Sequence, residues 1–150
     1  GRKATMKKGA ALKLFIQEVS GCIEEAKKYP ELSACTVKLS DALNIFMKIS
    51  ESLINLAPQG KTEEFLSDAT LYLEMAGTIA IAWQWLLQGI TAVKGLGKTE
   101  ELFFINFYSA KIHTMKYFFR SENPAVETLA KILTDNEHLT TGVSADIFID

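Results

Sequence analysis

Residues 92–99 read AVKGLGKT and are the first stretch of this 150-residue chain whose residue types and spacing could do chemistry. They match a relaxed phosphate-binding loop, in which backbone amides and a lysine surround phosphate groups, with alanine in place of the first glycine. A working loop of this kind follows a β-strand. Here a long helical pattern comes before it, and no hydrophobic strand ending in aspartate follows to hold magnesium. We therefore interpret residues 92–99 as a turn between two helices, without a nucleotide site.

The other reactive side chains form no recognisable site. Cys22 and Cys35 are not in CxxC spacing and fall on apolar helix faces, which favours buried reduced thiols over a disulfide. His113 falls on the polar side of its predicted helix, and His138 lies on a different element, so they form no set of metal ligands. No Ser/His/Asp or Cys/His constellation can be assembled either. The sequence predicts no catalytic residue, no cofactor-binding residue and no metal ligand in this chain.

Composition places the chain among soluble globular domains. Apolar residues make up 48% and charged residues 23%, and 150 residues suit a single domain. The net charge is −2 with scattered lysines and arginines, so no basic footprint for nucleic acid is present. No signal-peptide pattern and no glycosylation sequon occur, and we expect a cytoplasmic location.

The elements that must position these residues are all predicted to be helices. Apolar residues recur with a helical period along nearly the whole chain, and no segment alternates convincingly at period two. The fold class is therefore all-α: an up-and-down four-helix bundle with a short fifth helix and a C-terminal tail. The predicted helices span residues 6–29, 32–57, 63–94, 100–120 and 124–133.

Local signals set the helix ends. Pro30 disfavours a helical conformation at the residue before it, and Pro124 suits the first position of a helix, with Asn123 as a cap. The phrases GKTEEFL at 60–66 and GKTEELF at 97–103 each place a threonine that can cap free amides before two glutamates. The glutamates are favoured by the positive end of the helix dipole. We interpret this echo as shared start chemistry and not as a structural repeat.

The segment 75–93 contains no charged residue and is long enough to cross a membrane. Its side chains separate into two faces, however. One arc carries Glu74, Thr78, Gln84, Gln88 and Thr91, and the opposite side carries Tyr72, Ile79, Trp83, Leu86, Leu87 and Ile90. We therefore predict a weakly amphipathic central helix of a bundle and no membrane span.

The two tryptophans of this segment are predicted to differ. Trp83 lies at the middle of the apolar face and is expected in the core, whereas Ile81 and Trp85 point into the polar arc. Large apolar residues framed by polar ones are typical of a partner-facing surface. Ile81, Trp85 and Gln88 are the candidate interface; the alternative is that the fifth helix or the tail covers them.

The predicted helix 100–120 is apolar over an unusually wide arc, which includes Phe103, Phe107 and Phe119. Lys111 projects from the middle of this arc. A charge at such a position is costly unless it is paired or its ammonium group reaches solvent.

Two long segments resemble a known family. ATLYLEMAGTIAIAWQWLLQGITAV at 69–93 and FYSAKIHTMKYFFRSENPAVETLAKIL at 107–133 resemble the extra C-terminal domain of one branch of the acyl-CoA dehydrogenases. That branch includes the 3-methylmercaptopropionyl-CoA dehydrogenases. The similar features are a "YL…G" entrance to a Trp-containing helix, then "FY…K" and a break at proline. They cover residues 69–133, whereas the first two helices match in amphipathic layout only.

The resemblance implies a fragment of an FAD-dependent acyl-CoA dehydrogenase-like enzyme. In that family the flavin, the acyl-CoA and the proton-abstracting glutamate belong to domains upstream of this one, so no family catalytic residue carries over. The expected partners are the rest of the parent dehydrogenase or a second subunit. The expected role is docking on the catalytic core, where the domain can also line the entrance through which the acyl group passes. The alternative is a free-standing helical interaction or lipid-binding module with no catalytic activity.

Overall fold

The computed structural model describes residues 2–56, 62–121 and 124–134, and their secondary structure is entirely helical. The predicted all-α fold class is confirmed. Side-chain surroundings are described for residues 9–52, 69–121 and 124–133. The elements are α1 (Arg2–Ala26), the short 3-10 helix η1 (Pro30–Leu32), α2 (Ser33–Leu56), α3 (Thr62–Leu96), α4 (Leu102–Ser121) and α5 (Pro124–Thr134).

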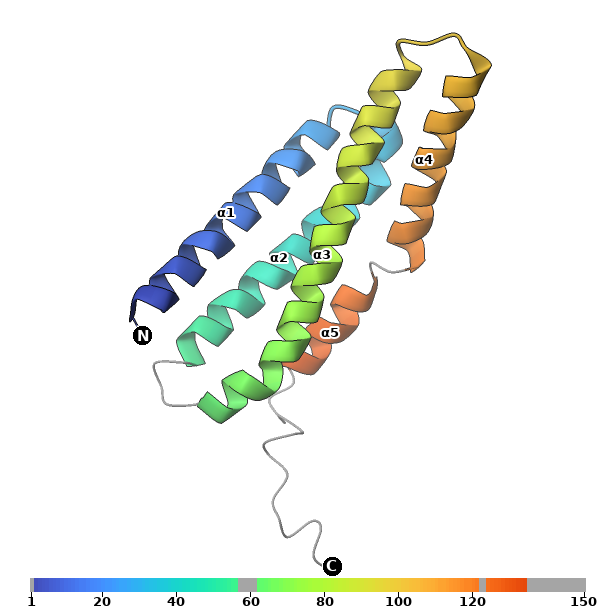
Figure 1. Cartoon of the computed structure of the whole chain (residues 1–150). Coiled ribbons are helices and arrows are strands. Elements are labelled where there is room, and N and C mark those ends of the chain that lie inside the picture. The colour runs from blue at the N-terminus through green and yellow to red at the C-terminus, as the bar shows by residue number, and fades with distance from the viewer. Residues whose placement is uncertain (1, 57–61, 122–123, 135–150) are drawn as a thin grey trace, which may run out of the picture.

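The helices run alternately up and down, as Figure 1 shows, with α3 as the longest. Helices α4 and α5 descend one after the other along α3, α4 beside its upper part and α5 beside its lower part. Together they fill the fourth position of the bundle, so the fifth helix completes the bundle instead of adding to it. α5 also packs on α2, which closes the lower core.

The first helix boundary differs from the prediction. α1 begins at Arg2 instead of residue 6 and ends at Ala26 instead of residue 29. Pro30 explains the end, because it holds Tyr29 in an extended conformation (φ −116°, ψ 104°). The chain then turns through η1 and enters α2 at Ser33, one residue after the predicted start.

The start chemistry predicted at the second GKTEE phrase is only partly right, because Glu100 and Glu101 both precede α4 and its first turn holds no acidic residue. The Glu101 amide donates a hydrogen bond to the Thr99 hydroxyl (3.2 Å), and α4 follows at Leu102 instead of residue 100. The Thr62 side chain of the first phrase lies outside the described side chains, as does the proposed cap Asn123. α3 continues past residue 94 to Leu96.

The core lies where α1, α2, α3 and α5 meet. Phe46 of α2 is 1% exposed, meets Phe15 of α1 edge-on (ring centroids 5.9 Å apart) and stacks on Tyr72 of α3 (5.0 Å). The Tyr72 hydroxyl shares a 2.7 Å hydrogen bond with buried Ser50, which also donates to the Phe46 carbonyl. The Ser50 and Tyr72 hydroxyls therefore satisfy each other in the core.

Cys22 and Cys35 are buried free thiols, as predicted. Burial, with a smaller contribution from the Glu25 carboxylate, raises the pKa of Cys22 to about 11. Burial also raises the pKa of Cys35. Neither thiol is an activated nucleophile, because nucleophilic cysteines have depressed pKa values.

Candidate docking surface

Helix α3 packs against α1, α2, α4 and α5, yet one line of its side chains stays uncovered. α1 lies on one side of this line and α4 on the other, with α3 between them (Figure 1). We call the line the open strip of α3. Its members are all exposed and uncharged: Leu73, Gly77, Ile81, Gln84, Gln88 and Thr91.

The spacing of the open strip follows one helical face. Successive members are three or four residues apart, which places them above one another along α3. The strip is about 27 Å long at the rise of an α-helix. Leu73 and Ile81 are 67% and 53% exposed. A long uncharged row with large exposed aliphatic side chains is typical of a binding surface.

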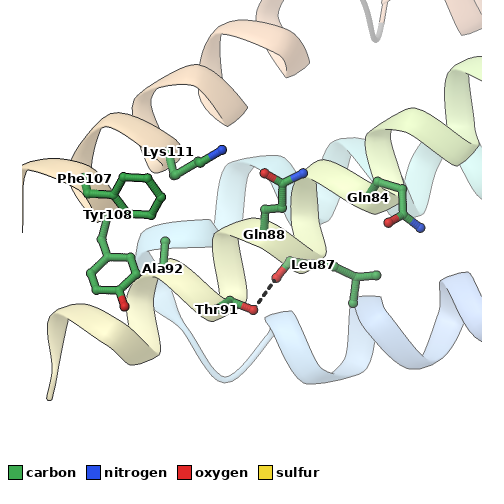
Figure 2. Close-up of a pocket in the computed structure, with 8 residues that line it drawn as sticks. All are labelled: Gln84, Leu87, Gln88, Thr91, Ala92, Phe107, Tyr108 and Lys111. Carbon is green, nitrogen blue, oxygen red and sulfur yellow. Dashed lines mark hydrogen bonds between the residues drawn. The ribbon is translucent and has the colours of Figure 1, made fainter. Parts of the chain in front are cut away.

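The upper end of the strip opens into a groove of about 220 Å³ between α3 and α4. Its walls mix aromatic, aliphatic and amide side chains with one ammonium group (Figure 2): Gln84, Leu87, Gln88, Thr91, Ala92, Phe107, Tyr108 and Lys111. The Thr91 hydroxyl donates to the Leu87 carbonyl (3.1 Å), so its proton is already used within the helix. The Gln84 and Gln88 amides are therefore the polar groups that the α3 wall of this groove can donate to a ligand.

Lys111 is half-buried on the α4 wall of the groove. Its ammonium nitrogen lies 5.6 Å from the centroid of the Phe107 ring, a cation–π arrangement. Among the described residues no carboxylate lies within ion-pair distance of it. The fold thus keeps a partly desolvated cation beside an apolar groove, where an anionic partner would be favourable.

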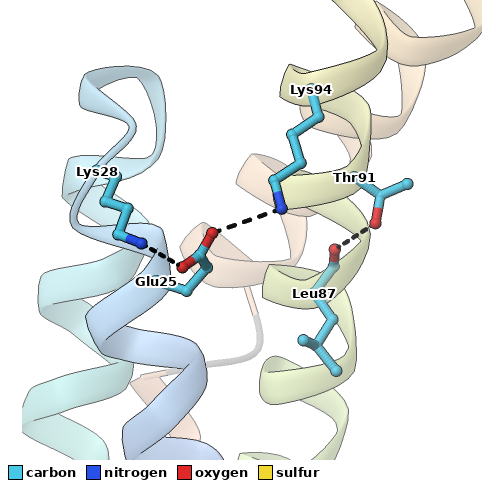
Figure 3. Close-up of polar contacts among 5 residues, drawn as sticks. All are labelled: Glu25, Lys28, Leu87, Thr91 and Lys94. Carbon is cyan, nitrogen blue, oxygen red and sulfur yellow. Dashed lines mark hydrogen bonds and ion pairs between the residues drawn. The ribbon is translucent and has the colours of Figure 1, made fainter.

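The opposite flank of α3 shows the contrasting case. Lys94 of α3 pairs with Glu25 of α1 at 3.5 Å, and Glu25 pairs with Lys28 at 2.8 Å (Figure 3). The hydrogen bond from Lys28, reinforced by Lys94, lowers the pKa of Glu25. The Glu25 carboxylate on this flank is therefore already paired with two cations.

The three predicted interface residues lie on or beside this surface. Ile81 and Gln88 are exposed members of the open strip. Trp85 is half-buried, and its ring stacks on Phe118 of α4 with centroids 6.4 Å apart. Among the described elements it is therefore α4, and not α5, that shields Trp85. The assignment of these residues to a partner interface stays a prediction.

The predicted placement of Trp83 in the core is only partly right. Trp83 is half-buried like Trp85 and meets Phe15 of α1 edge-on, with centroids 6.1 Å apart. Its indole Nε1 is buried and has no hydrogen-bond partner in the described part of the chain. The two tryptophans are buried to a similar degree because a helix packs on each side of α3. α1 contacts Trp83 and α4 contacts Trp85.

Sequence reasoning missed the α4 side of the surface. α4 leaves several large apolar side chains exposed: Leu102, Phe103, Phe104, Phe107 and Tyr117. Phe103 is 73% exposed and Tyr117 is 66% exposed. The available signal was the wide apolar arc of this helix, which exceeds what one neighbouring helix can cover.

The described residues contain no cluster of three or more His, Cys, Asp or Glu side chains that could hold a metal ion. Residues 92–96 form the last turn of α3, and residues 97–99 begin the link to α4. The phosphate-loop match is therefore preceded by a helix instead of a β-strand. His113 is exposed on α4, and His138 lies outside the described residues. Over the same part of the chain, no helix combines the length and hydropathy that a membrane crossing requires.

Comparison with known proteins identifies the domain type. A family model described as "Acetyl-CoA dehydrogenase C-terminal like" matches residues 15–143. The chain belongs to this family. The resemblance seen in residues 69–133 is thus confirmed at family level, and the match also includes the second half of α1 and all of α2. No curated protein and no solved structure matches this acetyl-CoA dehydrogenase C-terminal-like domain.

Proposed function

We propose that this chain is the C-terminal accessory domain of an FAD-dependent acyl-CoA dehydrogenase-like flavoenzyme, and that it serves docking and assembly on the catalytic core. The observation that carries the proposal is the family match over residues 15–143. Within the family, we assign the parent to the branch of the 3-methylmercaptopropionyl-CoA dehydrogenases, on the two segments within residues 69–133.

The surface supports a docking role. The described residues hold no metal-ligand cluster and no activated thiol, so the domain contributes through what it contacts. The open strip of α3 and the exposed aromatic residues of α4 form adjoining apolar areas, which isolated domains seldom leave uncovered. On this surface we place the remainder of the dehydrogenase or a second subunit. We further propose that the docked domain lines part of the entrance through which the acyl group reaches the catalytic core.

A second candidate is a free-standing helical module that binds lipid or another protein. It is favoured by the composition of α4, which carries Lys111, Lys116 and Arg120 and no acidic residue between Leu102 and Ser121, together with exposed aromatic rings. Such a basic aromatic helix can lie on an anionic membrane surface. The family match favours the accessory domain.

The test compares two proteins: the complete polypeptide encoded by the reading frame, and residues 1–150. The complete polypeptide is expected to carry FAD, visible in its absorption spectrum, and to reduce an electron acceptor when acyl-CoA is added. The 150-residue chain is expected to bind neither FAD nor acyl-CoA in calorimetric titrations. A complete polypeptide without a flavin-binding core would refute the accessory-domain function, and binding to anionic vesicles would then support the free-standing module.

A further inference from the structure

We propose that the open strip of α3 is the seat of a single helix from the catalytic core, and that a carboxylate on this helix pairs with Lys111. The inference rests on the proposed function, which supplies the core, and adds the shape and chemistry of the segment that docks. Three features of the described residues carry it: the exposed side of α3, the side-chain chemistry of the strip, and a lysine at its upper end that has no carboxylate partner among them.

The first feature is the vacant side of α3. α1 and α4 flank α3 and both pack on it, yet they leave the strip between them open along about five turns of helix. Gly77 lies at an exposed position, and a Cβ atom placed on it would meet no heavy atom within 4 Å. A partner backbone can therefore approach α3 closely at Gly77, with the exposed side chains of Leu73 and Ile81 on either side of it. Helices in bundles approach one another in this way, at about 8–10 Å between axes.

The second feature is the chemistry of the strip. A segment buried there must satisfy its own backbone amides and carbonyls, because buried polar groups without partners are costly. The strip offers it the amides of Gln84 and Gln88, while the Thr91 proton is already donated within α3. An extended segment or a loop would leave most of its backbone groups unsatisfied on this surface. A helix satisfies its backbone internally and is therefore the segment that fits.

The third feature is charge. Lys111 stands at the upper end of the strip without a carboxylate partner in the described part of the chain, and its helix α4 carries no acidic residue of its own. On the α1 flank the group formed by Glu25, Lys28 and Lys94 has one carboxylate and two cations. Both flanks thus present positive charge at this height. An Asp or Glu of the partner helix that docks beside Gln88 would complement this positive charge. One or two turns toward the N-terminus of α3, beside Ile81, an apolar residue of the partner helix would complement the strip.

Site-specific photocrosslinking in the complete polypeptide tests the proposal. A benzophenone amino acid at Gln88 is expected to crosslink to one helix of the core that contains an Asp or Glu, identified by mass spectrometry. Gly77→Leu fills the floor of the strip and is expected to lower the crosslink yield about tenfold. Ala34→Leu, at an exposed position of α2, is its matched control and is expected to leave the yield unchanged.

The charge contact has its own matched pair. Lys111→Glu is expected to reduce the yield about tenfold, whereas Lys116→Glu, exposed on the other side of the same helix, is expected to leave it unchanged. In the Lys111→Glu background, changing the crosslinked carboxylate to Lys is expected to restore the yield. This rescue separates a lost contact from a misfolded variant, and circular dichroism of each variant provides a second check.

Several outcomes would overturn the proposal: no crosslink from Gln88, a crosslink to a strand or loop, a crosslink to a second copy of this chain, or equal effects of Lys111→Glu and Lys116→Glu. Flavin content and acyl-CoA-dependent reduction are measured on the same wild-type preparation. If the flavoenzyme core is present and the crosslink fails, this inference falls and the proposed function stands. If no such core is present, the proposed function falls.

Discussion

Two phenylalanines show how differently the two ends of this bundle treat similar residues. Phe46 of α2 is 1% exposed, whereas Phe107 of α4 is 48% exposed. α2 has α1, α3 and α5 around it, while α4 packs mainly on α3. Neighbouring helices, and not the residue type, therefore decide which apolar side chains are sealed. The difference shows that α2 lies within an enclosed core and that α4 leaves large apolar side chains exposed.

Truncation of the two phenylalanines tests this contrast with the largest expected effect. Phe46→Ala removes a fully buried ring that contacts Phe15 and Tyr72, and is expected to lower the free energy of unfolding by about 3–5 kcal/mol. Phe107→Ala, at an exposed site, is expected to lower it by no more than about 1 kcal/mol. Urea denaturation of the 150-residue chain measures both. Equal losses would show that α4 is as deeply integrated as α2.

The tryptophans sharpen the comparison between the α1 and α4 flanks of α3. Trp83→Ala is expected to cost about 3 kcal/mol and Trp85→Ala about 1–2 kcal/mol, because Trp83 contacts the core ring Phe15 and Trp85 stacks on half-buried Phe118. Trp83→Phe is expected to cost less than about 1 kcal/mol, since it removes the buried indole N–H that has no partner. Denaturation and iodide quenching of tryptophan fluorescence compare the variants. A Trp83→Phe cost as large as that of Trp83→Ala would show that the N–H is satisfied.

Two glycines of α3 distinguish its packed side from its open side. A Cβ atom on Gly89 would lie 2.5 Å from the Met115 sulfur and 3.3 Å from Leu32, both fully buried, so Gly89→Ala is expected to destabilise the chain by about 1–2 kcal/mol. Gly77→Ala meets open space and is expected to stabilise it by about 0.5–1 kcal/mol, as Ala is the better helix former. Thermal unfolding gives both values. A stabilising Gly89→Ala would mean that α3 and α4 are not in close contact.

The last prediction concerns the buried thiol of Cys22, and its effect appears only at high pH. The pKa of Cys22 is raised from 9.0 to about 11, first by burial and then by Glu25. Above pH 9 the unfolded chain loses this proton while the folded chain keeps it, so stability is fully present below pH 9 and falls as pH rises toward 11. Urea midpoints from pH 7 to 10.5 are expected to decline above pH 9, and less steeply in Cys22→Ala. Parallel curves for the two proteins would contradict the assignment to Cys22.

The sequence predicted much of this fold because helical periodicity is a local signal. The burial of Cys22 and Cys35, the exposure of His113 and the link between two helices near residue 97 all followed from it. Periodicity does not predict how many helices pack against each face of a given helix. The wide apolar arc of α4 did not reveal that Phe103 and Phe107 would stay exposed, and the polar surroundings of Trp85 did not reveal its contact with Phe118. The sequence singled out Lys111, but its place beside Phe107 and Gln88 depends on how two helices meet.

The division of the fourth bundle position between α4 and α5 has a consequence for cooperativity. α5 places Val126, Leu129 and Leu133 in the core within 11 residues, whereas the 20 residues of α4 contribute Met115 and Phe119. We therefore expect two foldons. Amide protons of α4 will exchange with solvent through a partial opening that leaves the remaining helices assembled, and those of α2 will exchange only on global unfolding. Helix α4, which carries Lys111, can then adjust its position while the other helices stay folded.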